Sequence, residues 1–225
     1  MTRREMIMAS LALPLLGSDS GEFWNQRKPG EWTKDERGQL LADSPWARKP
    51  ALKFNGGPGP LGGPYGAWAA QSGGWVSGNG GIAPTKSPGT FGAVVRWESA
   101  LPVREAEAAG KKLQDDFAGF YVVSITGDVP MIVRGADETD DEYQSRLENL
   151  KEYTRLEKRG GPIYLQKIEP QPGKGMAAGT RFYFDRDQDI ALHDGSVTFV
   201  TRLGPLDLKC KFPLKDMVYQ GKLEL

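Results

Sequence analysis

The sequence predicts an α+β fold: a strand-helix-strand unit, a second helix and an antiparallel carboxyl-terminal meander, behind a Gly/Pro-rich amino-terminal extension. Three patterns support this prediction. Apolar residues recur every three or four positions after Pro102, which is typical of a helix packed on one face. Apolar and polar residues alternate near the carboxyl terminus, as in a half-buried strand. Gly and Pro supply 18 of the 38 residues of Asn55–Gly92, which separates an early segment from a regular domain, residues 93–225.

The charge balance and the Cys and His content exclude several classes of function. The 225 residues contain 29 Lys or Arg and 29 Asp or Glu, so the formal net charge is zero. A general nucleic-acid-binding protein needs a basic face to neutralise phosphates, and we therefore expect no nucleic-acid partner. One Cys and one His can form neither an intramolecular disulfide nor a usual zinc site, and no cofactor is predicted.

The amino terminus has the features of an export signal. Arg3 and Arg4 precede a mostly apolar run, Met6–Leu16, which is shorter than the roughly 20 residues of a membrane-spanning helix but suits a secretory signal. Residues 1–18 are therefore predicted to be a signal peptide of the general or twin-arginine-like kind, with an amphipathic or buried first helix as the alternative. The protein is then periplasmic or secreted, and it meets the membrane only through this segment during export.

Residues 19–54 are predicted to form a short helical module that carries tryptophans. Thr33 and Glu36 fit a capping box, in which hydroxyl and carboxylate satisfy backbone donors at a helix start. A helix over 34–42 follows, and the proline at position 45 favours its end. We expect three tryptophans to pack against the main domain rather than to stack on a ligand, because their large apolar area favours burial. They are Trp24, Trp32 and Trp46.

The Gly/Pro-rich segment, residues 55–92, is predicted to be a linker or a surface loop. Gly-rich chain is flexible and Pro blocks regular strand pairing. Its aromatic residues Tyr65, Trp68 and Trp75 are candidate binding residues, because they could instead stack on a partner such as a sugar ring.

The regular domain begins with the strand-helix-strand unit. A strand is expected over 93–98, an amphipathic helix from Pro102 to Phe117, and a buried strand over 120–125. Glu107 and Lys111 lie one helical turn apart, an order that favours a small surface contribution.

A second helix and a set of antiparallel strands complete the prediction. The helix is expected over 140–158, capped by Thr139 and stopped by Gly160-Gly161-Pro162. A loop is expected over 169–179, and a hairpin across Asp194-Gly195. The strands are expected over 163–168, 181–185, 190–193, 196–202 and 206–214.

Three aspartates and one histidine are candidates for metal binding or catalysis, but the neighbouring sequence also supports a simpler interpretation of each. Asp185, Asp187 and Asp189 are candidate ligands of a hard cation, but the positions that follow do not continue an EF-hand loop, and a charged connection between strands is the alternative. His193 is a candidate catalytic base because any Ser-His-Asp arrangement must use it. Its place beside a turn also suits a solvated surface group.

Glu98 is the acidic residue with the best position for chemistry. It stands at the end of a strand that leads into a helix, where the sites of α/β proteins gather. A solvated face is the alternative for Glu98, as for the other acids of the chain. Cys210 is expected to be a buried core thiol of raised pKa rather than a nucleophile, since Leu208 and Phe212 share its strand face.

Two stretches together resemble a family of uncharacterised exported proteins of acidobacterial type. They run from Glu31 to Ala47 and from Val95 to Ala106, and the likeness ends in Phe212–Leu223. The resemblance implies an envelope or secreted location, and it implies no activity, cofactor or catalytic residue.

These patterns support three hypotheses of function. The first is an exported binding or interaction domain whose partner is an envelope protein or a polysaccharide. The second is a cofactor-free, carboxylate-based hydrolase of cell-wall or carbohydrate polymers, which a cleft that clusters Glu98 with another acid would favour. The third is a structural component of an envelope assembly, which unpaired edge strands and a carboxyl-terminal tail, 217–225, reaching a neighbour would favour. We expect a binding domain rather than an enzyme.

Overall fold

The computed structural model describes residues 22–54, 92–113, 117–127, 138–171, 179–203 and 206–225. The helices are α1 (Phe23–Gln26), α2 (Lys34–Ala42), α4 (Leu101–Ala108) and α5 (Asp140–Tyr153), with short 3₁₀ turns at Pro29–Glu31, Leu192–Asp194 and Leu214–Asp216. The strands are β1 (Ala47–Arg48), β2 (Ala51–Phe54), β3 (Val94–Trp97), β4 (Phe120–Thr126), β5 (Arg155–Lys158), β6 (Gly161–Gln171), β7 (Gly179–Asp185), β8 (Ser196–Leu203), β9 (Leu206–Pro213), β10 (Val218–Tyr219) and β11 (Lys222–Leu223).

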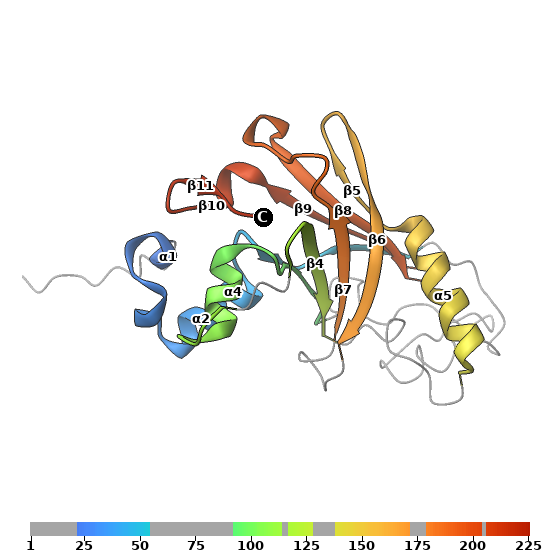
Figure 1. Cartoon of the computed structure of the whole chain (residues 1–225), viewed down its shortest axis with the longest axis horizontal. Coiled ribbons are helices and arrows are strands. Elements are labelled where there is room, and N and C mark those ends of the chain that lie inside the picture. Colours follow the sequence, from blue (N-terminus) through green and yellow to red (C-terminus); the bar gives the residue numbers. More distant parts are fainter. Residues whose placement is uncertain (1–21, 55–91, 114–116, 128–137, 172–178, 204–205) are drawn as a thin grey trace, which may run out of the picture.

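The described strands form one large antiparallel sheet, which corrects the predicted α+β fold. Nine strands join in the order β1-β3-β4-β7-β6-β5-β8-β9-β2, and β10 and β11 form a separate hairpin. Each neighbouring pair runs antiparallel. The expected strand-helix-strand unit exists as β3, α4 and β4, but its two strands pair directly, and it is one part of a mostly β, curled half-barrel (Figure 1).

The sheet curls so far that its two ends approach each other. β1 and β2 lie at opposite ends of the strand order, yet only Lys49 and Pro50 separate them in the chain. From Arg48 to Ala51 there are three Cα–Cα steps, which cover no more than about 11 Å. The rings of Trp97 and Phe212, which are far apart in strand order, accordingly lie 5.6 Å apart between centroids.

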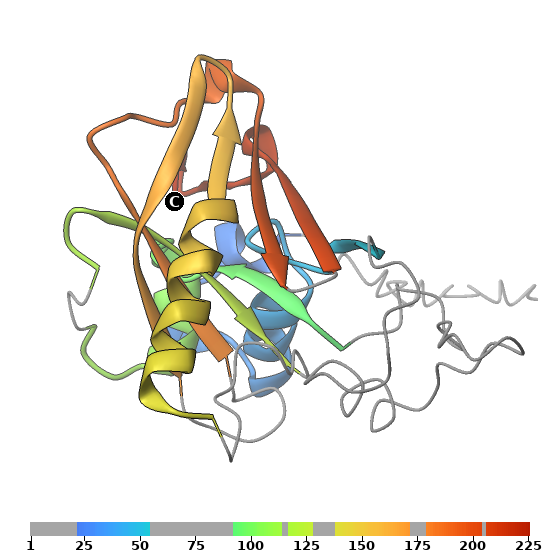
Figure 2. The same cartoon turned by 90° about the vertical axis from the view of Figure 1, so that its right-hand side faces the viewer.

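Helices cover the sheet at two places (Figure 1). α2 packs on α4 and on the β1–β3 end of the sheet, whereas α5 lies against β6 and β8. Figure 2 views the molecule from the α5 side. No helix of the described part of the chain is long and apolar enough to cross a membrane.

The core fills the inside of the curl and includes the early tryptophans, as predicted. Trp24, Trp32 and Trp46 belong to the same buried cluster as Phe182 and Phe199. Trp46 is fully buried, and its indole Nε1 donates to the carbonyl of Glu224 at 2.9 Å. The carboxyl-terminal tail therefore packs on its own chain, and Met217, Tyr219 and Leu225 are buried there.

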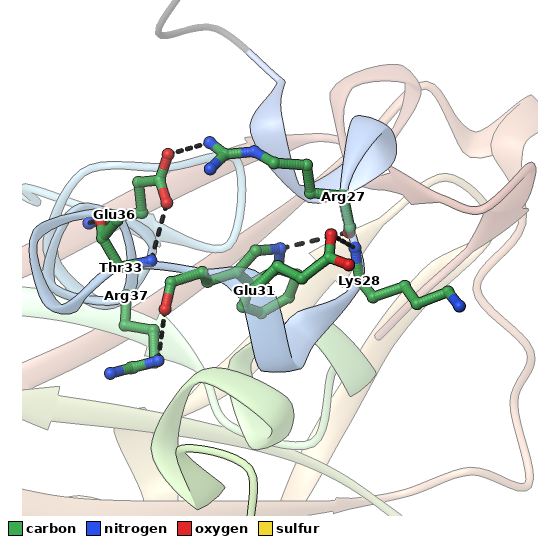
Figure 3. A network of polar contacts seen from close by, with 7 residues as sticks. Arg27, Lys28, Glu31, Thr33, Glu36 and Arg37 are labelled. Carbon is green, nitrogen blue, oxygen red and sulfur yellow. Dashed lines mark hydrogen bonds and ion pairs between the residues drawn. The ribbon is translucent and has the colours of Figure 1, made fainter.

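A polar network fastens the turn before α2 (Figure 3). The predicted capping box is confirmed: the Thr33 hydroxyl accepts from the Glu36 amide at 3.2 Å, and Glu36 accepts from the Thr33 amide at 2.8 Å. Arg27 pairs with the same Glu36 carboxylate, and Arg37 donates to the carbonyl of Trp32. Trp32 in turn donates from its indole to the carbonyl of Arg27 at 3.3 Å, so the network holds a buried ring in place.

Both predicted helices of the main domain are shorter than expected. α4 ends at Ala108 because Ala109 and Gly110 take positive φ angles of 49° and 85°, which break the helical path long before Phe117. α5 keeps its predicted cap at Thr139 but ends at Tyr153. There the buried Thr154 becomes extended, and its hydroxyl bonds to the carbonyl of Leu150 and to Thr201, each at 2.6 Å.

The residues beyond α5 correct three further predictions. Residues 155–158 form strand β5 rather than helix, and Gly160-Gly161 turns the chain back into β6 with φ angles of 88° and 129°. β6 continues to Gln171, into the predicted loop. The hairpin expected across Asp194-Gly195 is wrong: this stretch is a 3₁₀ turn in which Asp194 accepts from the amide of Ala191. β8 instead pairs with β9, whose inside-outside alternation is confirmed.

Trp46→Ala tests whether the early segment is part of the core. We expect it to lower the free energy of unfolding by about 3–5 kcal/mol, because a large buried side chain leaves a cavity. Trp46→Phe should cost less, about 1–3 kcal/mol, since it keeps most of the ring but leaves the Glu224 carbonyl without its donor. Urea titration followed by circular dichroism measures both. An Ala variant as stable as the wild type would contradict this packing.

Candidate functional site

A row of polar side chains crosses one face of the sheet near α4. The strand register pairs Arg96 of β3 with Ser124 of β4, and Ser124 with Arg181 of β7. Directly paired residues of antiparallel strands project from the same face, so these three form one line. The next row on that face holds Thr126, paired with Gly179.

Glu98 meets this row from the end of β3. The chain stays paired with β4 beyond Trp97, because the Ser99 amide donates to the carbonyl of Val122 and the Ser99 hydroxyl accepts from the Val122 amide. Glu98 is two positions from Arg96 and therefore on the same strand face. Its side chain is only 2% exposed.

Arg96 and Ser124 satisfy one oxygen of the Glu98 carboxylate. Arg96 donates to Oε1 from Nε at 3.0 Å and from Nη2 at 2.6 Å, and the Ser124 hydroxyl donates to the same oxygen at 2.6 Å. The other oxygen, Oε2, is buried and has no hydrogen-bond partner among the described residues.

Arg96 also connects the sheet to both neighbouring helices. Its Nη1 donates to the carbonyl of Leu41 in α2 at 3.4 Å, and its Nη2 donates to Glu107 Oε1 in α4 at 2.8 Å. The side chain is 14% exposed. One guanidinium therefore holds two carboxyl groups and a helix carbonyl, a use of its planar, five-donor geometry that Lys could not match.

The pKa of Glu107 is raised to about 7, near neutral pH. Burial of its carboxyl group is the main cause, and the negative charge of Glu98 is the second. Arg96 and Arg181 act in the opposite direction. The side chain as a whole is 34% exposed, but Oε1 is held against Arg96, so the carboxyl group is less hydrated than this fraction indicates. Two acids beside each other resist double ionisation, and Glu107 takes the proton.

These groups line a cavity of about 300 Å³, which we call the inner pocket. Arg181 also lines the inner pocket, and its Nε is buried and has no hydrogen-bond partner among the described residues. A hydrogen bond with Glu98 is a further cause of the raised Glu107 pKa, so protonated Glu107 can donate to the Glu98 carboxylate. The remaining lining residues are Arg96, Glu107, Ser124, Thr126, Gln171, Gly179 and Thr180.

A second cavity, the outer pocket, adjoins the inner one. It measures about 330 Å³ and shares Glu107 and Arg181 with its neighbour. Its other lining residues are Arg104, Ala108, Lys111, Lys112, Leu113 and Phe117. Among the described residues that line the outer pocket, every charged one apart from Glu107 is basic.

The structure places the other candidate residues away from the two pockets or outside the described ranges. Tyr65, Trp68 and Trp75 lie outside the described residues. His193 is 79% exposed, with Asp194 as its nearest acid at 3.9 Å. Asp185, Asp187 and Asp189 do not gather: the described part of the chain holds no group of three His, Cys, Asp or Glu that could bind a metal ion.

The structure also tests the predictions for Cys210 and for the pair of Glu107 with Lys111. Cys210 is buried as expected, and desolvation raises its pKa to about 12. Glu107 was expected to form a surface pair with Lys111, but its carboxyl group contacts Arg96 instead. Sequence reasoning therefore found Glu98 and missed Glu107 and Arg181, because their approach depends on which strands pair. The one local signal was Ser124, a polar residue inside a buried apolar strand.

A double-mutant cycle tests the Arg96–Glu98 pair. Arg96→Met should lower the free energy of unfolding by about 3–5 kcal/mol, because it leaves a buried carboxylate unpaired. Adding Glu98→Met should recover part of this loss, since the charge is then gone. Arg155–Glu157 is the matched control: it has the same two-residue spacing on a strand and a 2.5 Å contact, but its side chains are 34% and 40% exposed. Arg155→Met should cost less than about 1 kcal/mol. Equal losses in the two single variants, by urea titration, would contradict a buried role.

The comparisons with known proteins leave the site to be interpreted from its own geometry. No protein-family model, no curated protein and no solved structure matches the chain.

Proposed function

We propose that the protein is an exported binding domain that holds a polar, negatively charged ligand in the inner pocket. One observation supports this proposal most directly. Two arginines, Arg96 and Arg181, line one cavity together with the carboxyl group of Glu107, whose pKa is raised to about 7. The export signal, residues 1–18, lies outside the described residues, and localisation stays a prediction.

The side chains that line the inner pocket specify what the ligand must offer. A carboxylate can accept from the guanidinium group of Arg181. The surrounding Thr126 and Gln171 can donate or accept, which suits hydroxyl groups.

The charge balance of the inner pocket favours an anion. Arg96 and Arg181 carry two positive charges, Glu98 is paired with Arg96, and Glu107 has a pKa of about 7. When Glu107 is protonated, positive charge exceeds negative charge in the pocket. A carboxylate on the ligand would balance the excess and could form the paired hydrogen bonds that arginine favours.

Calorimetric titration with glucuronate, and with glucose as its neutral counterpart, tests this proposal. We expect glucuronate alone to bind, and Arg181→Gln to weaken it at least tenfold. Arg159→Gln, at an exposed arginine, is the control and should have no effect. Affinity should fall as pH rises through about 7, because deprotonated Glu107 then repels the ligand's carboxylate. Equal binding of the two sugars, or affinity that rises with pH, would contradict an anion site.

A second candidate function, hydrolysis of a carbohydrate polymer, is favoured by the clustering of Glu98 with Glu107. The protonated Glu107 would donate its proton to the leaving oxygen of a glycosidic bond, and water would add across the bond and return a proton. Glu98 cannot act as nucleophile, because it is buried against Arg96 and Ser124.

The spacing of the acids weighs against this second candidate. Both carboxyl groups bind the same nitrogen of Arg96, so they are closer than the roughly 6.5–9.5 Å of inverting glycosidases. Within the described ranges, the lining residues of the two pockets include no third acid that could activate water.

Reducing-end release from polygalacturonate separates the two candidates. A hydrolase would release sugar ends with the wild type and lose at least about 100-fold in rate with Glu107→Gln, the range typical of a general acid. Glu148→Gln, an exposed helical acid of α5, is the control. Binding without any release, in wild type and variants alike, is the result we expect.

A role in an envelope assembly finds less support in the described residues. Its expected sign, a carboxyl-terminal tail that reaches a neighbour, is not what these residues show, since the tail packs on Trp46 and on the core.

A further inference from the structure

We infer that the ligand is an acidic polysaccharide chain lying across the inner and outer pockets. This inference rests on the proposed function and extends it from a single charged group to a repeating polymer. It follows from the adjacency of the two pockets, from the charge of the outer one, and from the strands that form the wall.

The two pockets adjoin each other. Arg181 and Glu107 line both, so a ligand group bound at Arg181 lies beside the outer pocket as well as in the inner one. A small molecule would fill the inner pocket alone, whereas a chain that continues past Arg181 would reach the outer pocket.

The outer pocket, like the inner one, favours a negatively charged ligand. Arg104, Lys111 and Lys112 line it, and both lysines are exposed at its rim. A ligand with one charge cannot use this second basic group while bound at Arg181. A ligand that carries a carboxylate on each unit can use both, which raises affinity through the high effective concentration of its second unit.

An aromatic side chain lies between the basic groups. The Phe117 ring has the guanidinium of Arg181 at 5.2 Å and that of Arg104 at 6.0 Å from its centroid. These contacts place both arginines against the Phe117 side chain, which packs with Val122 and Tyr183. Phe117 is only 9% exposed, so it positions the two basic groups rather than contacting the ligand.

The strands below the two pockets favour a saccharide over an acidic peptide. Extended peptides commonly bind by adding a strand to an exposed sheet edge, where backbone groups are unpaired. β4 and β7 form the wall here, and both are interior strands with neighbours on each side. The pocket offers side-chain donors and acceptors instead, and sugar hydroxyl groups can use both kinds.

Calorimetry with galacturonate, tetragalacturonate and tetraglutamate tests the inference on the full chain. We expect tetragalacturonate to bind at least about tenfold more tightly than galacturonate, in line with the gain from linked sites. Lys111→Gln combined with Lys112→Gln should remove most of that gain and leave the affinity for galacturonate unchanged. Lys209→Gln combined with Lys211→Gln, on the exposed face of β9, is the matched control and should keep the gain. Arg181→Gln should weaken both sugars.

Each contrary outcome identifies what is wrong. If galacturonate binds but the tetramer binds no better, the extended site is wrong and the proposed function stands. If tetraglutamate binds as tightly as tetragalacturonate, the saccharide assignment is wrong. If none of the three binds, the proposed anion site fails together with this inference.

Discussion

The buried guanidinium of Arg96 is the contact on which the site and its surroundings depend. It joins the end of β3 to α2 and α4, and it holds Glu98 and Glu107 beside each other. A buried ion pair often adds little net stability, because desolvation of both charges offsets their attraction. Its value here is geometric. It holds two carboxyl groups beside each other, and burial together with the charge of Glu98 raises the pKa of Glu107 to about 7.

The curl of the sheet explains why an antiparallel fold of modest size has a polar pocket on its outer side. Large rings such as Phe182, Phe184 and Phe199 fill the inside. The outward face of β4 and β7 is divided: Val122 and Tyr183 pack with Phe117 in a small apolar cluster, whereas Ser124 and Arg181 are polar. The polar part of this face carries the candidate site.

Local features of this fold could be predicted from the sequence, and non-local ones could not. The capping boxes at Thr33 and Thr139 and the alternation of β9 depend on neighbouring residues, and they are confirmed. β5 was missed because Arg155–Lys158 is charged and follows a helix, so only its pairing with β6 and β8 makes it a strand. Glu98 was noticed from its place at a strand end. Its partner Glu107 and the donor Arg181 come near it only through the register of three strands, which no single segment encodes.

The pairing of β2 with β9 determines when, during synthesis of the chain, the sheet can be completed. Ala51 is paired with Lys209, so the early strand finds its place only after nearly the whole chain has been made. At a synthesis rate of about 5–20 residues per second, the interval is on the order of 10–30 seconds. During that time β2 has no β9 strand to pair with. The β2 edge of the sheet can therefore be completed only after Leu206–Lys209 of β9 have been made.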